Sequence, residues 1–72
     1  MSTFAERIKQ LRAETKLSSE EFARKIYFNT KTVQLWEKGN VRPCTDALII
    51  ISKTFRVSAD WLLGLSDRKE RD

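Results

Sequence analysis

Residues 17–39, LSSEEFARKIYFNTKTVQLWEKG, constrain the fold more than any other stretch of this chain. They open with Ser18 and, three residues later, Glu21, a capping box that satisfies free amides at a helix start. The apolar residues that follow share one helical face and are Phe22, Ala23 and Ile26. This pattern predicts that a short helix begins at Ser18.

A second helix is predicted to begin at Asn29, because asparagine caps helix N-termini well. Val33 and Trp36 lie three residues apart on its inner face. Gly39 fits just beyond its end, where glycine adopts a left-handed conformation at little cost. Two helices joined by so few residues cross at a large angle, and the small side chain of Ala23 suits the crossing point.

The outward face of the second helix has the character of a DNA-reading surface. If Val33 and Trp36 point inward, four other side chains point away, namely Thr30, Lys31, Gln34 and Leu35. Short polar and cationic side chains in the first turn of a helix suit contact with base edges in the major groove.

Sixteen residues occur along the chain in a specific order and spacing, namely Arg12, Leu17, Ser18, Ala23, Val33, Trp36, Glu37, Gly39, Pro43, Val57, Ser58, Asp60, Trp61, Leu62, Leu63 and Gly64. In these residues the chain resembles the helix-turn-helix domain of phage repressors and Cro-like regulators, the Xre type. The resemblance covers roughly residues 3–65. It implies an all-α fold, a compact domain of about five helices that binds duplex DNA, usually as a symmetric dimer.

The resemblance also implies roles for individual residues. The cap and the groove-facing residues would be Asn29, Thr30, Lys31, Thr32, Gln34 and Leu35. The candidates for contact with the DNA backbone are Ser19, Lys38 and Arg42. Arg12 and Glu37 are implied to form a structural ion pair that ties the first helix to the reading helix. A phosphate contact is the other role open to Arg12.

Three residues depart from the family pattern. Ser19 stands where a longer glutamine often braces the DNA backbone. Tyr27 stands in the turn where glycine is usual, and an L-residue in a left-handed conformation there costs roughly 1–2 kcal/mol. Leu35 occupies a DNA-facing position that is more often polar, so it either touches a thymine methyl group or lies near the groove edge.

The rest of the chain predicts three further helices. The first has a capping box of Thr3 and Glu6 and ends near residue 15 or 16. Three basic residues are expected to lie off its inner stripe, namely Arg7, Lys9 and Arg12. A fourth helix is expected at about residues 45–55, and a fifth begins after the cap Ser58. The expected core is Phe4, Ile8, Leu11, Leu17, Phe22, Ile26, Phe28, Val33, Trp36, Leu48, Ile51, Phe55, Val57, Trp61 and Leu62.

Charge is distributed unevenly along the 72 residues, whose net charge is +4. Residues 1–56 contain eleven Lys or Arg and six Asp or Glu, a net charge of +5, whereas residues 57–72 contain three and four, a net charge of −1. The basic part includes the predicted helix pair. The excess of basic residues favours a polyanionic partner. The alternative is that these residues form a solvated basic surface without a partner.

The chain is expected to form one domain over residues 1–65, followed by a polar tail at residues 66–72 that frays because it has no apolar side chain. The longest apolar run, residues 47–51, is too short to cross a membrane. The N-terminus lacks the layout of a signal peptide. A single cysteine fits a reducing, cytoplasmic setting.

Catalysis finds little support in the composition. Histidine, the commonest general base and metal ligand, is absent, and two glycines cannot form a Gly-rich phosphate loop. Cys44 has no partner for a zinc site or a Cys-His pair. It either stands in place of a serine, without a special function, or acts as a redox switch. We therefore expect no catalytic residue, no metal and no cofactor, and a protein that is not an enzyme.

The predicted function is sequence-specific binding of double-stranded DNA by a prokaryotic or phage transcriptional regulator, a repressor. It would act as a homodimer on an inverted-repeat operator, without a membrane. The alternative is an antitoxin-type protein-interaction module that neutralises a partner protein and also binds DNA. A second chain that co-purifies in stoichiometric amount would favour this alternative.

Overall fold

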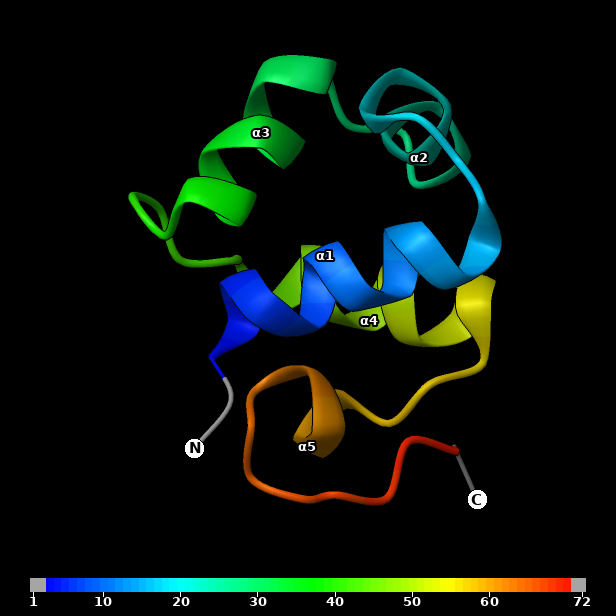
Figure 1. Ribbon diagram of the computed structural model, residues 1–72, viewed down its shortest axis with the longest axis vertical. Helices are drawn as coiled ribbons and strands as arrows, with labels where there is room; N and C mark the ends of the chain where they lie inside the picture. The colour runs from blue at the N-terminus through cyan, green and yellow to red at the C-terminus, as the bar shows by residue number, and fades with distance from the viewer. Residues whose placement is uncertain (1–2, 71–72) are drawn as a thin grey trace.

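The computed structural model describes residues 3–70. Its five helices are α1 (Phe4–Thr15), α2 (Ser19–Lys25), α3 (Thr30–Lys38), α4 (Thr45–Phe55) and α5 (Ala59–Leu62). In the view of Figure 1, α1 and α4 cross the middle of the molecule, with α2 and α3 on one side and α5 on the other. The prediction of an all-α fold is confirmed. No helix within residues 3–70 has both the length and the apolar composition needed to cross a bilayer.

Local capping interactions set the predicted helix starts. The Thr3 amide donates to Glu6 Oε1 at 3.1 Å, and the Glu6 amide donates back to Thr3 Oγ1 at 3.2 Å. Ser18 and Glu21 repeat this reciprocal pair at 2.9 and 3.1 Å. Ser58 Oγ accepts from the Trp61 amide at the start of α5. Each cap satisfies amides that a helix start leaves without partners, so the expected boundaries are confirmed.

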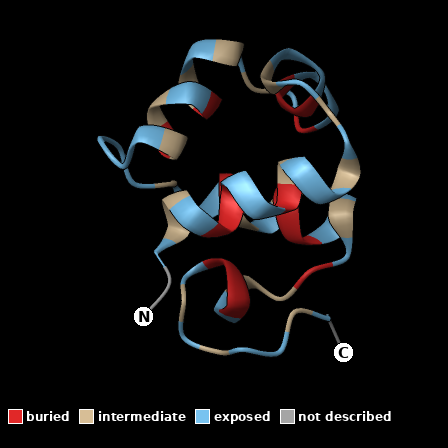
Figure 2. Cartoon of the chain, viewed as in Figure 1, coloured by how far each residue is buried: buried red, intermediate tan, exposed pale blue. Residues whose placement is uncertain are grey.

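The core lies where the helices face one another, as the burial colours of Figure 2 show. Its buried apolar residues are Ile8, Leu11, Phe22, Ala23, Ile26, Val33, Trp36, Ala47, Ile51, Val57, Trp61 and Leu62. Five residues expected in the core instead pack against it half-buried, namely Phe4, Leu17, Phe28, Leu48 and Phe55. A 72-residue domain has too little interior to enclose every apolar side chain, so some of them remain partly solvated at its edge. The small Ala47 is completely enclosed.

Arg7 is buried, which corrects the expectation that it lies off the inner face of α1. Its guanidinium carbon lies 4.7 Å from the centre of the Trp61 ring, and Nη2 lies 3.5 Å from Asp67 Oδ1. The Nε atom of Arg7 is buried without a hydrogen-bond partner. A cation over an aromatic face is stabilised by the ring quadrupole, which offsets part of the desolvation of the charge.

Residues 66–70, here called the C-terminal strap, account for this burial. The Ser58 amide donates to the Lys69 carbonyl at 2.8 Å, and Val57 and Glu70 form an isolated antiparallel bridge. Lys69 Nζ lies 5.5 Å from the Trp61 ring centre. The expectation of a frayed tail is therefore wrong for residues 66–70. Arg71 and Asp72, which belonged to the same expectation, lie outside the described residues.

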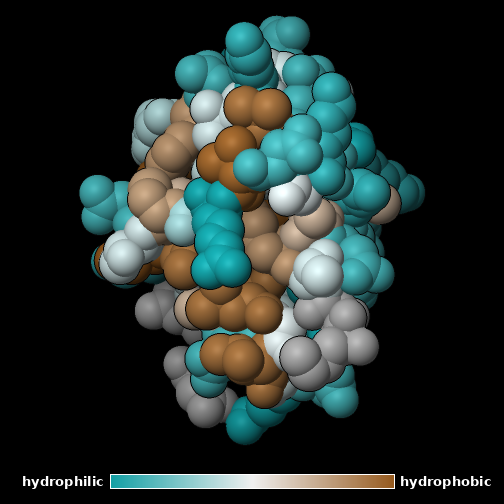
Figure 3. All heavy atoms as spheres, turned by 90° about the vertical axis from the view of Figure 1, so that its left-hand side faces the viewer, coloured by the Kyte–Doolittle hydropathy of each residue, from teal (hydrophilic) through white to brown (hydrophobic). Residues whose placement is uncertain are grey.

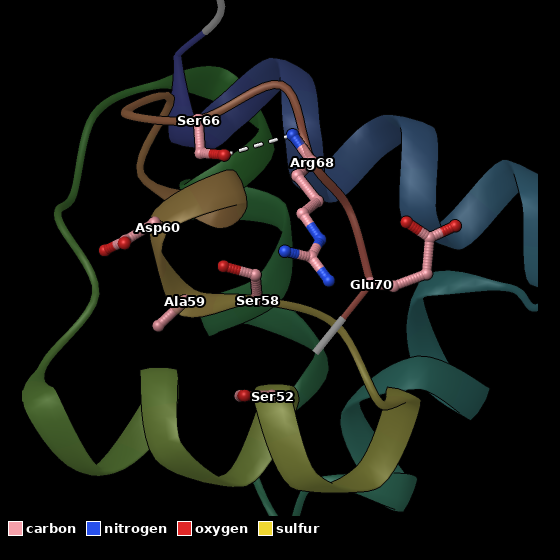
Figure 4. Close-up of a pocket in the computed structure, with 7 residues that line it drawn as sticks. All are labelled: Ser52, Ser58, Ala59, Asp60, Ser66, Arg68 and Glu70. Atoms are coloured by element: carbon pink, nitrogen blue, oxygen red, sulfur yellow. Dashed lines mark hydrogen bonds between the residues drawn. The ribbon is translucent and has the colours of Figure 1, made fainter. Parts of the chain in front are cut away.

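An open polar hollow of about 440 Å³ lies between the strap, α4 and α5. Figure 4 shows the Arg68 side chain extending into this hollow toward Ser58, while the Arg68 amide donates to Ser66 Oγ at 3.0 Å. The other lining residues are Ser52, Ala59, Asp60 and Glu70. The buried Ser52 hydroxyl is already engaged, because it donates to the Val57 carbonyl at 2.6 Å.

Candidate nucleic-acid interface

The turn between α2 and α3 keeps the geometry implied by the family resemblance. Tyr27 has a φ of 64°, in the left-handed region, and its side chain is 87% exposed. The Tyr27 amide donates to the Arg24 carbonyl, and the Phe28 amide donates to the Ala23 carbonyl at 3.0 Å. A tyrosine thus occupies a backbone position that favours glycine, which confirms the transfer of the turn geometry.

Two buried side chains orient α3. Val33 is 0% and Trp36 is 2% exposed, and they hold the helix against the body of the domain. The opposite face exposes Lys31, Gln34 and Lys38, whose spacing of three and four residues places them along one stripe. From Lys31 to Lys38 this stripe rises about 10 Å along the axis. We call these three residues the α3 stripe.

The N-terminus of α3 is built around Asn29. Its Oδ1 atom accepts from both the amide and the hydroxyl of Thr32, each at 2.8 Å. The Thr32 hydroxyl was expected to face the groove, and its hydrogen is committed to this cap. Thr32 therefore retains its hydroxyl lone pairs and its methyl group for DNA. Thr30, the first residue of the helix, is half-buried.

An ion pair joins α3 to α1. Arg12 Nε donates to Glu37 Oε2 at 2.6 Å, and Arg12 Nη2 donates to Glu37 Oε1 at 2.9 Å. Arg12 Nη1 also donates to the Leu17 carbonyl at 3.4 Å. The hydrogen bonds with Glu37 raise the pKa of Arg12 above its ordinary value. This bidentate geometry fixes both the distance and the rotation of α3 relative to α1.

The remaining predicted contact residues flank α3. Ser19 is the half-buried first residue of α2, which lies to one side of α3, and Leu35 is half-buried on α3 itself. Gly39, with a φ of 79°, ends α3. The loop beyond it lies on the other side and exposes Arg42. The structure thus places the predicted residues on α3 and on the two segments that flank it.

An apolar hollow of about 320 Å³ lies between this loop and the start of α1. Hydrophobic residues are exposed on that side of the molecule, as Figure 3 shows. The hollow is lined by Thr3, Phe4, Ala5, Trp36, Gly39, Val41, Arg42 and Pro43. Arg42 therefore lies at the edge of this hollow, on the loop that follows α3.

Lys9 is a residue of this region that received no role from the sequence. The structure places it beside Gln34, Glu37 and Lys38, where these four side chains line a hollow of about 500 Å³ between α1 and α3. A sequence signal was available. Lys9 lies three residues before Arg12, so pairing of Arg12 with Glu37 brings Lys9 to the same side of α3.

The described residues offer few groups for metal binding or cysteine chemistry. Within the part of the chain that the structure describes, no cluster of three or more His, Cys, Asp or Glu residues could hold a metal ion. Cys44 is exposed at the N-cap of α4 and makes no side-chain capping hydrogen bond.

Comparison with known families settles which proteins this chain is related to. The profile of the family described as helix-turn-helix matches residues 8–62, most of the chain. This chain belongs to the helix-turn-helix family. The resemblance to Xre-type and Cro-like regulators is thereby confirmed, and the match spans all five helices from within α1 to the end of α5.

Two curated helix-turn-helix proteins are similar in sequence. The uncharacterized HTH-type transcriptional regulator YobD of Bacillus subtilis (strain 168) is 34% identical over 64 residues, covering 89% of this chain and 57% of YobD. The HTH-type transcriptional activator BcrR of Enterococcus faecalis is 37% identical over 61 residues, covering 85% of this chain and 30% of BcrR. This chain therefore spans less than two thirds of the length of either relative.

Solved structures show the same helix-turn-helix fold. The P22 c2 repressor protein, crystallised with a synthetic operator, superposes with a TM-score of 0.84 at 23% identity, covering 92% of this chain and 100% of the other. A transcriptional regulator from Listeria innocua superposes with a TM-score of 0.81 at 28% identity, covering 97% of this chain and 65% of the other.

Proposed function

We propose that this chain is the sequence-specific, double-stranded DNA-binding part of a transcriptional regulator, with residues 1–65 as the binding domain and no catalytic activity. The observation that carries the proposal is the α3 stripe. Lys31, Gln34 and Lys38 are exposed on a helix whose opposite face is anchored by Val33 and Trp36. A helix held so firmly can enter the major groove without losing its orientation.

In this proposal α3 reads the bases and its neighbours hold the backbone. Thr30 and Lys31 in the first turn meet base edges, and Gln34 and Leu35 follow along the groove. Ser19, Lys38 and Arg42 contact phosphates on either side. The net charge of +5 in residues 1–56 supports this arrangement, because phosphate neutralisation supplies much of the affinity for DNA.

We further propose that two copies act together as a repressor in the cytoplasm of a prokaryotic or phage-infected cell. Leu63 is 40% and Leu65 is 72% exposed directly after α5, and they offer apolar surface to a second copy. Such a dimer would read two inverted half-sites about 34–36 Å apart. Repression is the simpler outcome, because a bound dimer blocks polymerase without a further contact surface.

The experiment is a selection of bound duplexes from a random pool, followed by fluorescence anisotropy across a salt series. We expect an inverted repeat to be enriched and the affinity to fall steeply between low and moderate salt. Replacing Lys31 and Gln34 together by Ala should abolish the preference. Lys53→Ala removes one charge from an exposed site on α4 and should preserve it. Failure of the wild-type protein to bind any selected duplex at low salt would refute DNA binding.

Dimerisation and repression have tests of their own. Leu65→Asp places a charge in the proposed interface, so sedimentation should show a monomer with unchanged circular dichroism. In a reporter strain, the selected site placed over a promoter should lower expression in the presence of the protein. Increased expression would instead indicate an activator.

A further inference from the structure

The hollow between α1 and α3 presents two lysines from different helices. Lys9 of α1 and Lys38 of α3 line it together with Gln34 and Glu37. Gln34 and Lys38 also belong to the exposed α3 stripe. The hollow is therefore continuous with the surface that we propose to face DNA, and it opens beside that surface.

The acids near these lysines are already engaged. Glu37 accepts both hydrogen bonds from Arg12, and its side chain is only 12% exposed. Glu6, which precedes Lys9 by three residues, accepts from the amide and the hydroxyl of Thr3 at 3.1 and 3.2 Å. Among residues 3–70, no ion pair joins Lys9 or Lys38 to a carboxylate. Two cations and one carboxamide thus line the hollow beside the Glu37 carboxylate, whose charge is already paired with Arg12.

We propose that Lys9 and Lys38 clamp one phosphate of the DNA strand that borders the groove read by α3. The inference rests on the proposed function and extends it by a residue of α1. Each ammonium group has three donors on a flexible stem, so both lysines can turn toward one phosphate at this hollow. A phosphate placed there accepts from both helices and neutralises both cations.

The clamp acts as a positioning device. The Arg12–Glu37 pair holds α1 and α3 at a fixed distance, so the backbone positions of Lys9 and Lys38 stay fixed relative to each other while their side chains turn to the strand. A phosphate held between them sets how far α3 slides along the groove. Phosphate contacts fix register and orientation but carry no sequence information, so the clamp should act equally on all duplexes.

The test compares wild-type protein with Lys9→Ala, Lys38→Ala and the charge-matched control Lys53→Ala. Lys53 is exposed in a hollow that α4 forms with α5, away from the clamp. Anisotropy is measured on the selected duplex and on an unrelated duplex over a salt series. Loss of either clamp lysine should weaken both duplexes by about fivefold and lower the salt slope by about 1. Lys53→Ala should change neither quantity.

A methylphosphonate scan then identifies the phosphate. Neutralising one position per half-site should remove the effects of Lys9→Ala and Lys38→Ala together. If Lys9→Ala behaves like Lys53→Ala, or if the two lysines respond to different positions, the clamp is wrong although DNA binding stands. If wild-type protein binds no duplex, the proposed function fails with it. Circular dichroism melts confirm that each variant is folded.

Discussion

Arg12 on α1 and Glu37 on α3 are joined by two hydrogen bonds of 2.6 and 2.9 Å across 25 residues of sequence. The Glu37 side chain is 12% exposed and that of Arg12 is 30% exposed. Removal of either partner leaves a poorly solvated charge unpaired. The pair therefore matters for the orientation of α3, the helix that we propose to read DNA.

We expect Arg12→Ala and Glu37→Ala each to lower the free energy of unfolding by about 1–3 kcal/mol. Arg12→Ala should lower the free energy of unfolding more, because it leaves the less exposed Glu37 carboxylate without a partner. The double variant should lose less than the sum of the two, as measured by urea denaturation. The matched control is the exposed pair Glu20–Arg24, whose coupling should stay below about 0.5 kcal/mol. Equal coupling in both cycles would contradict this prediction.

Tyr27→Gly should stabilise the domain by about 0.5–1 kcal/mol. Relief of the left-handed strain contributes about 1–2 kcal/mol, and the greater freedom of glycine in the unfolded chain opposes it by about 0.5–1 kcal/mol. Tyr27→Ala is the control, because it removes the exposed ring but keeps the Cβ atom and hence the strain. Thermal denaturation of all three proteins distinguishes these contributions. A gain of equal size for alanine would assign the effect to the ring.

The capping boxes predict a loss of stability in acid. Hydrogen bonds from the Ser18 backbone and then its side chain lower the pKa of Glu21 from its ordinary value of 4.5. Because the folded-state pKa is depressed, the stabilisation is present above the unfolded pKa and is lost as pH falls through the folded pKa. The melting temperature of Glu21→Gln should lie below that of the wild type at neutral pH. The two should converge in acid, and a constant difference across pH would argue against the linkage.

The strap predicts a stability contribution from the C-terminal residues. Lys69 pairs with Glu14 and lies over the Trp61 ring, so Lys69→Ala should cost about 1 kcal/mol. Lys25→Ala, at an exposed site on α2, should be neutral. A chain that ends at residue 65 should remain folded but melt lower, with tryptophan emission shifted toward that of water-exposed indole. An unchanged melt after truncation would show that the strap contributes nothing.

Variants of α3 and of the loop after it should distinguish residues that contact bases from residues that contact the DNA backbone. Lys31→Ala should lose about 1–3 kcal/mol on the selected site and relax the preference at one base pair per half-site. Arg42→Ala should weaken all duplexes by a similar factor and reduce the salt slope. A panel of single-base changes measures both. Uniform weakening by Lys31→Ala would make Lys31 a phosphate contact and leave reading to Thr30, Thr32, Gln34 and Leu35.

Much of the fold and the predicted reading surface could be obtained from the sequence, because the relevant interactions are local. Caps such as Ser18 and Asn29 bond to amides within three residues, and Gly39 ends α3 through its own backbone freedom. The inner face of α3 follows from helical period alone. Even the left-handed Tyr27 was predictable from the family resemblance, because the turn is short.

Local sequence patterns thus account for the five helices, the side-chain caps at four of their N-termini and the outward face of α3. Only the packed domain shows that the strap covers Arg7 and Trp61, and that Lys9 and Lys38 line one hollow. Arg7 and Trp61 are 54 positions apart in sequence, and Lys9 and Lys38 are 29 apart. Neither periodicity nor propensity encodes such pairs, because both describe a chain only over a few residues. A polar segment such as residues 66–70 looks unfolded until a buried cation and an aromatic ring give its charges partners.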